Sequence, residues 1–370
     1  MNNIFNIARF DGDGIGPEIN REAVKVINAV SSYLGNFKCE FESLPAGAAV
    51  YRETGVAFPE DSKETAKQAH AILLGSMGLP EVTKPDGTEV QGDMIVMTRK
   101  ELDLYKGVRP AKLRPNVPSP LRNTGKGIDL ILIREQSEGL FASYQSSHTI
   151  HDQVYSDSMI ITRRGSERIT RTAFELSRKR NGAPSDGQKR VTCVDKSNNF
   201  KSMAFFRKIY QEVAGQYPDV AKDYCYIDAI MILMLQKPDF YDVLVLENMW
   251  GDILSDLTGA VIGGMGFAPS GDIGDDYAMF QCAGGSAPTI AGQNIANPIA
   301  QIMAGAMMLD WLGERHGVEE AVVAAKAIDL AIDSVLTSGH LTCDIGGKTK
   351  TDEFGDLVVE HLKTVCDQLK

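Results

Sequence analysis

The chain has 370 residues, of which 43% are hydrophobic and 24% charged, a composition typical of a globular protein with enough buried core for two lobes or domains. Its formal net charge of −11 at pH 7 would repel a polyanion, and no block of Lys and Arg resembles a phosphate-tracking stripe. The composition therefore argues against nucleic-acid binding. An anionic small molecule would need local Arg and Lys residues to hold it.

Cysteine usage and apolar patterning bear on the compartment. The six cysteines are scattered, without a CxxC pair or the dense spacing of a disulfide scaffold, which favours reduced thiols. The N-terminal stretch lacks the basic and apolar segments of a signal peptide, and no uninterrupted apolar run approaches the length of a membrane span. We therefore expect a protein that stays in the cytoplasm and does not bind a membrane.

Short apolar runs alternate with helix-length amphipathic patterns along the chain. Residues 6–10 predict a strand, and residues 11–18 predict a turn that opens a helix, since Pro17 and Glu18 suit a first helical turn. Further strands are predicted at four apolar runs, residues 71–74, 130–133, 191–194 and 243–246. This alternation predicts an α/β fold.

Three other segments complete the predicted order. Residues 181–188, rich in Gly, Pro, Ser and Asp, are expected to form a connection, and residues 259–274 are glycine-rich and expected to be a loop at their centre. Residues 298–312 predict a helix whose methionines pack in the core.

Two glycine-rich stretches invite a phosphate-binding interpretation. Residues 12–17 resemble a dinucleotide fingerprint, but Pro17 stands where the fingerprint needs glycine, and Asp11 and Asp13 would repel a pyrophosphate. Residues 346–349 lack the first glycine of a P-loop, because Thr342 occupies that position. We predict neither an ordinary Rossmann site nor a P-loop.

Three aspartates are candidate metal ligands. Asp252 and Asp256 are four residues apart, so on a helix their Cβ atoms would lie about 5–6 Å apart and their charges would repel unless a cation lay between them. Alternatively, Asp252 merely complements a helix N-terminus. Asp228 stands in the apolar run 226–235, where a buried, unpaired carboxylate would be costly. Oxygen-only ligands of this kind suit Mg²⁺ or Mn²⁺.

Four basic residues are candidates for binding an anion or moving a proton. Arg99 and Arg109 are ten residues apart, and Arg134 follows a predicted strand, where α/β sheets present ligand-binding residues. Together they are suited to clamp a dicarboxylate, although each alone is more often a surface ion-pair residue. Lys196 follows another predicted strand and is a candidate general base.

These residues occur in ordered motifs along the chain. The motifs are the 11–18 turn, residues 74–78, 99–110, 134–138, 194–198 and 247–256, and residues 285–288 continuing to 297–298. In this order they resemble the isocitrate/isopropylmalate dehydrogenase family, the metal-dependent β-decarboxylating dehydrogenases, from end to end.

The resemblance implies a two-domain isopropylmalate dehydrogenase-like α/β fold that differs from an ordinary Rossmann fold. The first domain, on the cofactor side, would comprise residues 1–104 plus 263–370, and the second, residues 105–262, would carry the substrate and metal site and the dimer interface. Residues from about 148 to 164 would form an arm that interlocks two subunits. The implied assembly is a homodimer, or a higher homo-oligomer, with shared active sites.

The resemblance also implies a role for each motif. Arg99, Arg109 and Arg134 would hold a 2-hydroxy dicarboxylate or tricarboxylate. Asp252 and Asp256 would bind Mg²⁺ or Mn²⁺, and Lys196 and Asp228 would enter from the neighbouring subunit. The nicotinamide cofactor would be bound by Gly284, Gly285, Ser286, Ala287, Thr289, Ile290, Asn297 and Asn198. The implied reaction is NAD(P)-dependent oxidative decarboxylation of a 3-substituted malate.

One departure from the family concerns the proton donor. The family usually has a tyrosine seven residues after the arginine equivalent to Arg134, where this chain has Phe141. Phe141 has no proton to give, so Tyr144, another group or water would protonate the enolate. If nothing does, the chain is a catalytically attenuated ligand-binding or regulatory subunit.

Substrate and cofactor choice depend on two other places. Isocitrate enzymes resemble one another in having serine and asparagine where this chain has Asp93 and Ile95. An acidic side chain would repel a γ-carboxylate and an isoleucine cannot hydrogen-bond it, so these two predict an apolar or small C3 substituent, as in 3-isopropylmalate, malate or tartrate. Homoisocitrate-type relatives share an Ile-Val pair, however, so isocitrate or homoisocitrate stays an alternative. Ile290 favours NAD, whereas Thr289 favours neither nucleotide, so NADP stays open.

Overall fold

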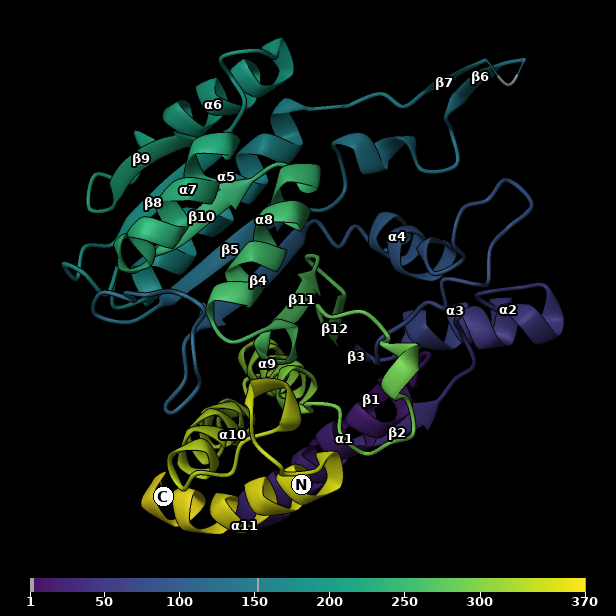
Figure 1. Cartoon of the computed structure of the whole chain (residues 1–370), viewed down its shortest axis with the longest axis vertical. Coiled ribbons are helices and arrows are strands. Elements are labelled where there is room, and N and C mark those ends of the chain that lie inside the picture. The colour runs from purple at the N-terminus through teal and green to yellow at the C-terminus, as the bar shows by residue number, and fades with distance from the viewer. Residues whose placement is uncertain (1–2, 152, 370) are drawn as a thin grey trace.

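The computed structural model describes residues 3–151 and 153–369, and a ten-stranded sheet runs through it (Figure 1). The strand order is β2-β1-β3-β12-β11-β4-β5-β10-β8-β9. These strands are β1 (Asn3–Phe10), β2 (Phe37–Ser43), β3 (Ala71–Leu74), β4 (Lys106–Lys112), β5 (Asp129–Glu135), β8 (Arg190–Asp195), β9 (Ala221–Tyr226), β10 (Val243–Leu246), β11 (Pro269–Ile273) and β12 (Ala278–Cys282).

The sheet consists of two parallel halves joined by antiparallel strands. β2, β1, β3 and β12 are parallel neighbours, and so are β5, β10, β8 and β9. Between them, β12 pairs antiparallel with β11, β11 with β4, and β4 with β5. The α/β prediction is confirmed, and the arrangement differs from an ordinary Rossmann sheet, as predicted. The predicted domain boundary would fall between β11 and β4.

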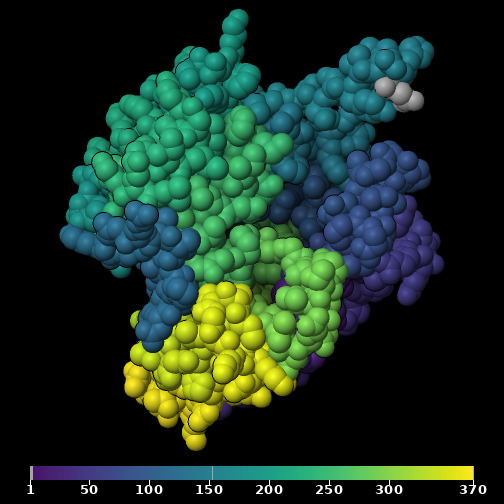
Figure 2. All heavy atoms as spheres, in the orientation of Figure 1, coloured from purple at the N-terminus to yellow at the C-terminus, as the bar shows by residue number. Residues whose placement is uncertain are grey.

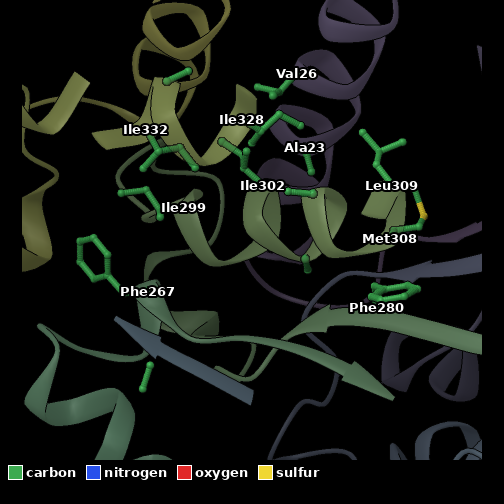
Figure 3. Close-up of a cluster of buried hydrophobic side chains, with 14 of the residues drawn as sticks. Ala23, Val26, Phe267, Phe280, Ile299, Ile302, Met308, Leu309, Ile328 and Ile332 are labelled. Carbon is green, nitrogen blue, oxygen red and sulfur yellow. The ribbon is translucent and has the colours of Figure 1, made fainter. Parts of the chain in front are cut away.

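Four long helices cover one face of the first half-sheet. They are α1 (Gly16–Leu34), α9 (Ile299–His316), α10 (Glu319–Thr337) and α11 (Thr351–Leu369). Figure 3 shows side chains of α1, α9 and α10, including Val26, Ile302 and Ile328, meeting above the strands. Met308 is buried and Met303 and Met307 pack against the same cluster, so the predicted core role of these methionines is confirmed.

The remaining helices cover the other faces. α3 (Glu60–Gln68) and α4 (Gly92–Glu101) contribute to a separate core on the far side of the first half-sheet, and α2 (Ala48–Thr54) lies near them (Figure 1). α5 (Arg163–Lys179) and α6 (Lys201–Ala214) pack on one face of the second half-sheet, and α7 (Ile227–Gln236) and α8 (Asn248–Val261) pack on the other.

Burial on both faces explains the continuous apolar runs in the sequence. In β5, Leu130 and Leu132 face the core that includes α7 and α8, whereas Ile131 and Ile133 face α5 and α6. The predicted strands at 71–74 and 243–246 have the observed bounds, and the other three are longer by one to three residues at one or both ends. The predicted loop at the centre of 259–274 is confirmed, because residues 262–268 lie between α8 and β11 and contain only turns and a short 3-10 helix, whereas the end of the segment is the buried strand β11.

A two-stranded hairpin stands away from the body of the molecule (Figure 1). It consists of β6 (His148–Ile150) and β7 (Val154–Ser156), and every described residue in both strands is exposed. The hairpin lies within the predicted arm at 148–164, although α5 begins at Arg163. Its predicted pairing with a second subunit stays a prediction. Within the described part of the chain, no helix has the length and apolarity to cross a membrane.

Candidate active site

A cavity of about 500 Å³ lies where the two halves of the sheet meet. Its lining includes residues of α4, β4, β5, α8, β11 and β12, and Figure 2 shows the surface hollowed between the corresponding parts of the molecule. Of the predicted substrate, metal and catalytic residues, the lining includes Ile95, Arg99, Arg109, Arg134, Phe141, Tyr144 and Asp252. The structure thus brings together the three arginines that the sequence places far apart.

Each arginine lies at a position in its helix or strand from which its side chain reaches the cavity. Arg99 lies in the last turn of α4, and Arg134 lies near the carboxyl end of β5. Arg109 is on β4, where alternate residues are buried, so that Gly107, Arg109 and Ala111 share the buried face. All three guanidiniums are largely removed from water, and the Arg134 side chain is only 2% exposed. Buried charges of this kind need anionic partners.

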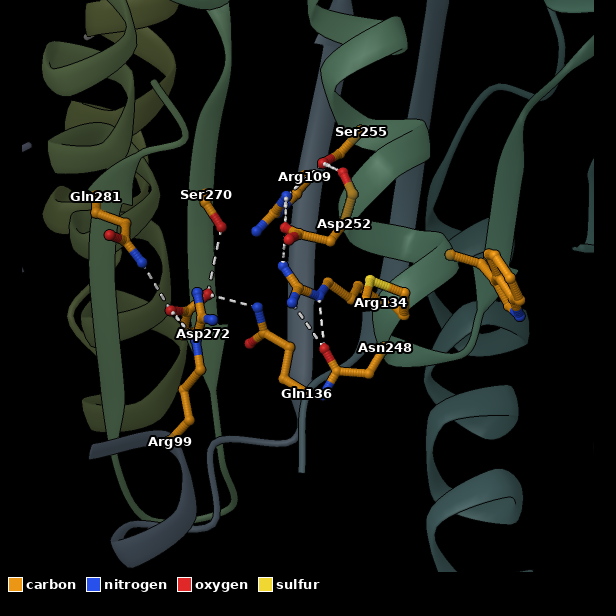
Figure 4. Close-up of polar contacts among 12 residues, drawn as sticks. Arg99, Arg109, Arg134, Gln136, Asn248, Asp252, Ser255, Ser270, Asp272 and Gln281 are labelled. Atoms are coloured by element: carbon orange, nitrogen blue, oxygen red, sulfur yellow. Dashed lines mark hydrogen bonds and ion pairs between the residues drawn. The ribbon is translucent and has the colours of Figure 1, made fainter. Parts of the chain in front are cut away.

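Helix α8 supplies the partners of two of these arginines (Figure 4). Arg134 donates to Asn248 Oδ1 through Nε at 2.9 Å and Nη2 at 2.7 Å, and it also donates to Asp252. Arg109 donates to Asp252 Oδ1 at 3.3 Å and to the Ser255 hydroxyl. Asp252 is therefore an ion-pair partner of both arginines, a contact that neither sequence interpretation of this residue includes.

The charges in this cluster would favour the binding of an anionic ligand. Burial lowers the pKa of Arg134, and the nearby Arg109 lowers it further. Burial alone would raise the pKa of Asp252, but Arg134 and Arg109 outweigh it and the net shift is downward. Because three guanidiniums crowd one cavity, an additional carboxylate from a ligand would relieve their mutual repulsion.

The metal prediction rests on Asp252 and Asp256, both on α8. Burial raises the pKa of Asp256, and the Asp252 carboxylate raises it further, which is the repulsion that a cation between the two would remove. Their oxygens fit a hard divalent ion. Within residues 3–151 and 153–369, however, no group of three or more His, Cys, Asp or Glu residues could hold a metal. One chain therefore offers only part of a ligand set.

Lys196 and Asp228 lie outside the cavity. Lys196 Nζ is 2.6 Å from Asp228 Oδ1, and the Asp228 side chain is 67% exposed. The premise that Asp228 is a buried, unpaired carboxylate is therefore wrong, because α7 turns this first-turn residue toward solvent. Neither residue is among those that line the cavity.

Phe141 and Tyr144 line the same cavity but differ in their contacts. The Phe141 ring centroid is 5.0 Å from the Arg134 guanidinium carbon. The Tyr144 hydroxyl donates to Asp93 at 2.8 Å and accepts from Lys84 at 3.3 Å. A Cβ at Gly92 would lie 2.4 Å from this hydroxyl, so only glycine allows the tyrosine to approach α4 so closely.

Asp93 is one place where the sequence interpretation needs revision. Its carboxylate accepts from Tyr144, Lys84 and Gln145, and it is absent from the residues that line the cavity. Burial opposes ionisation, but the Tyr144 and Lys84 contacts outweigh it and lower the pKa of Asp93. Because Lys84 pairs with this carboxylate, the predicted repulsion of a substrate carboxylate by Asp93 is weakened. Ile95, in contrast, lines the cavity.

A second cavity, of about 410 Å³, adjoins the first. Both are lined by Ser76, Cys282, Gly284 and Gly285. Of the predicted cofactor residues, Gly284, Gly285, Ala287, Ile290 and Asn297 line this second cavity. Ser286, Thr289 and Asn198 do not: Ser286 is buried and donates to the Gly78 carbonyl, and Asn198 is exposed beside Lys196. The predicted contact of Asn198 with the cofactor stays a prediction.

Several residues around the two cavities were not predicted. Asp272 accepts hydrogen bonds from Arg99, Gln136 and Gln281, and Asp344 lines the second cavity. Asp272 escaped notice because glycines at 259–274 suggested a loop rather than a buried strand. A signal for Asp344 was available, since it lies two residues before the 346–349 stretch that was assigned to a turn.

A cleft lined by three arginines, next to a largely apolar cavity, is the arrangement expected of an enzyme that holds an anionic substrate beside a cofactor. The family model described as "Isocitrate/isopropylmalate dehydrogenase" matches residues 6–358. The chain is 39% identical to a 3-isopropylmalate dehydrogenase of Thermotoga maritima, over 97% of this chain and 99% of the relative. It is 35% identical to a probable tartrate dehydrogenase/decarboxylase of Bacillus subtilis, over 97% of this chain and 98% of the relative.

Among solved structures, an isocitrate dehydrogenase from Methylococcus capsulatus superposes with a TM-score of 0.83 at 34% identity, covering 97% of this chain and 99% of that one. The chain belongs to the isocitrate/isopropylmalate dehydrogenase family. It is a dehydrogenase of the β-decarboxylating type, a family that acts on hydroxy acids and uses NAD(P) and a divalent metal ion.

Proposed function

We propose that the protein catalyses the NAD- and Mg²⁺- or Mn²⁺-dependent oxidative decarboxylation of a malate with an alkyl or small C3 substituent, with 3-isopropylmalate the first choice. The observation that carries this proposal is the group of three arginines in a cavity that shares Ser76, Cys282, Gly284 and Gly285 with the second cavity. That arrangement would set C2 of a bound hydroxy acid beside a nicotinamide.

The character of the cavity favours a dicarboxylate over a tricarboxylate. Arg99, Arg109 and Arg134 are matched by the carboxylates of Asp252 and Asp272 in direct contact with them, so one positive charge is unmatched. Ile95 and Val96 line the cavity one turn before Arg99 and cannot hydrogen-bond a further carboxylate. A methyl or isopropyl group would bury apolar surface against them.

The residues of the chain have distinct roles in the proposed reaction. The arginines orient the two carboxylates, and Lys196 of a second copy accepts the C2 hydroxyl proton as hydride leaves C2. When bound, nicotinamide supplies the hydride acceptor and a divalent ion supplies a Lewis acid for the 2-oxo acid. The electron pair of the breaking C–C bond then passes into an enolate as CO₂ leaves, and the enolate takes up a proton at carbon.

Tyr144 is our candidate for that last proton. It lines the cavity with its hydroxyl held between Asp93 and Lys84. Burial raises the pKa of Tyr144, as does the Asp93 carboxylate, so the phenol is protonated at neutral pH. Lys84, also in contact with the hydroxyl, has protons to return to it after each turnover.

A homodimer would complete the site. The outer faces of α7 and α8 carry exposed apolar residues, among them Ile232, Leu235 and Ile253, which are 59%, 48% and 45% exposed. An apolar face of this kind favours a protein interface. Asp228 begins α7 beside it, so a second copy covering this face would bring Lys196 and Asp228 toward the neighbouring Asp252 and Asp256.

NAD is favoured over NADP by the lining of the second cavity. Among the described residues that line it there is no Lys or Arg to meet a 2′-phosphate, and Asp344 and Ile290 both lie there. An aspartate accepts hydrogen bonds from ribose hydroxyls and repels a phosphate.

The test is a panel of 3-isopropylmalate, malate, tartrate, homoisocitrate and isocitrate with Mn²⁺ and either nucleotide, followed by absorbance of the reduced cofactor. We expect turnover of an alkyl- or hydrogen-substituted malate or of tartrate with NAD, poor turnover of isocitrate, and none in excess chelator. A preference for isocitrate would contradict the substrate proposal. Binding without any cofactor reduction would instead identify a catalytically attenuated subunit.

Shared sites are tested by mixing inactive Lys196→Ala subunits with inactive Asp256→Ala subunits. Each hybrid has one site with both defects and one with neither, so activity should reappear after subunit exchange. Hybrids confirmed by mass spectrometry that stay inactive would show that Lys196 does not act across an interface.

A further inference from the structure

Asp272 is a fully buried carboxylate beside the cleft. It lies on β11, the strand at the junction of the two half-sheets, and is 0% exposed. Its Oδ2 accepts from Arg99 Nε at 2.9 Å and from Gln281 Nε2 at 2.9 Å. Its Oδ1 accepts from Gln136 Nε2 at 3.0 Å and from the Ser270 hydroxyl at 3.3 Å. Figure 4 shows these four side chains converging on it.

The surroundings are built around this carboxylate. Gln136 reaches Asp272 past Gly107, where a Cβ would lie 2.7 Å from the Gln136 amide carbon. Four donors, one of them the Arg99 guanidinium, favour the charged form of Asp272. Accordingly, Arg99, Arg109 and the hydrogen bond from Gln136 lower the pKa of Asp272 against the opposing effect of burial. A permanent negative charge thus lies directly under Arg99.

We propose that Asp272 is a positioning and specificity-determining residue, which fixes Arg99 toward the cleft and, by neutralising it, sets the cleft for a dianionic rather than a trianionic substrate. This inference rests on the proposed function for the identity of the site. Asp272 does not line the cavity, whereas Arg99, Ser270 and Gln281 do. Its effect on substrate therefore passes through those side chains.

Among the direct ion pairs, Arg109 and Arg134 share Asp252, and Arg99 has Asp272, so two carboxylates contact three guanidiniums and one positive charge is unmatched. Asp256 acts on Arg109 and Arg134 without an ion pair, and its charge is the same in the wild type and in a variant of Asp272. Removing the Asp272 charge would double the unmatched positive charge from one to two. A third substrate carboxylate would then meet a more favourable potential, while Arg99 would lose the acceptor that fixes its Nε.

The decisive variant is Asp272→Asn, which keeps the size and one acceptor oxygen but removes the charge. Asp275→Asn is the matched control, because Asp275 follows the same strand, pairs with Lys106 and Tyr105, and is 74% exposed. Binding of 3-isopropylmalate and isocitrate to the full-length protein with Mn²⁺ is measured by titration calorimetry, and turnover by cofactor reduction.

For Asp272→Asn we expect binding of 3-isopropylmalate to weaken by at least about tenfold. The ratio of its affinity to that of isocitrate should fall by about tenfold, and the KM for NAD should stay within about twofold of the wild type. The control should match the wild type in all three. The proposal would be overturned if the variant lost affinity for both substrates and for NAD alike, or if nothing changed. A wild type that binds 3-isopropylmalate without turnover would count against the proposed function only.

A double-mutant cycle with Arg99→Gln separates positioning from general damage. If Asp272 acts through Arg99, Asp272→Asn should change 3-isopropylmalate binding no further in the Arg99→Gln background. The doubly neutral pair leaves no uncompensated buried charge, so it remains measurable even if Asp272→Asn alone fails to fold. Additive effects would overturn the proposal.

Discussion

Replacing Tyr144 by phenylalanine tests the proposed proton donor. The change removes one hydroxyl and with it the hydrogen bond to Asp93 and the one from Lys84. At about 1 kcal/mol for each partly buried hydrogen bond, the loss of unfolding free energy is about 2 kcal/mol. That is a fraction of the 5–15 kcal/mol by which domains are typically stable, so the variant should fold.

The effect on catalysis should be larger than the effect on stability. General-acid catalysis contributes about 10²-fold or more, equivalent to about 2.7 kcal/mol of activation free energy. In single turnovers of Tyr144→Phe with 3-isopropylmalate, we expect the reduced cofactor to form at nearly the wild-type rate, while release of the protonated product slows about 10²-fold.

A control and a rescue separate proton donation from packing. Tyr105→Phe is the matched control, since that phenol donates to Asp275 outside the cavity. Adding Phe141→Tyr to Tyr144→Phe should restore part of the lost rate, because it supplies a hydroxyl from a neighbouring wall of the same cavity. Equal product release in wild type, Tyr144→Phe and the double variant would refute the assignment and leave water as the donor.

Two further predictions concern stability. Burial raises the pKa of Glu135 to about 7 from 4.5, although Ser137 and Glu138 donate to it. Because a carboxyl with a raised pKa destabilises the fold progressively as pH rises through that interval, urea unfolding should show about 3 kcal/mol less stability at pH 8 than at pH 4.5 from this group. Glu135→Gln should lose that dependence of stability on pH, and parallel slopes in the two proteins would contradict the assignment. The Arg114 side chain is 5% exposed between Asp329 and Asp333, and its replacement by leucine should lower the free energy of unfolding by about 3 kcal/mol, because two partly buried carboxylates are left with Lys112 alone. The same replacement at the exposed Arg178 should lower it by less than about 1 kcal/mol. Equal losses in denaturant titrations would refute the distinction.

The apolar runs predicted β1, β3, β5, β8 and β10, but neither β4, β11 and β12 at the centre of the sheet nor β2 and β9 at its edges. Runs such as Val243–Leu246 are apolar on both sides because helices cover both faces. β11, in contrast, contains Ser270, Gly271 and Asp272, which resemble a loop when only composition is considered. Those residues are polar because they lie under the site, so the signal for a strand is weakest where the strand carries function.

The candidate site divides in the same way. Arg99, Arg109 and Arg134 were identified by motif order, and the structure places them on one cavity. The sequence did not predict their partners Asp272 and Asn248, because partner identity depends on long-range packing. For Asp228 the surrounding apolar run suggested burial in the core. Only one face of α7 is buried, however, and Ile232 and Leu235 form an exposed face that suits an interface.

This exposed face suggests how a shared site can be built from chains that first fold alone. In a single chain Lys196 pairs with Asp228, and the buried arginines pair with Asp252 and Asp272. Each buried arginine therefore has a carboxylate in contact before assembly, so no guanidinium is left without an anionic partner in the monomer. The Lys196–Asp228 pair is exposed and worth little, so separating it costs little when a second copy covers α7. If Lys196 accepts a proton from substrate as proposed, the pair that it leaves is a weak one, while the buried pair of Arg99 with Asp272 stays intact.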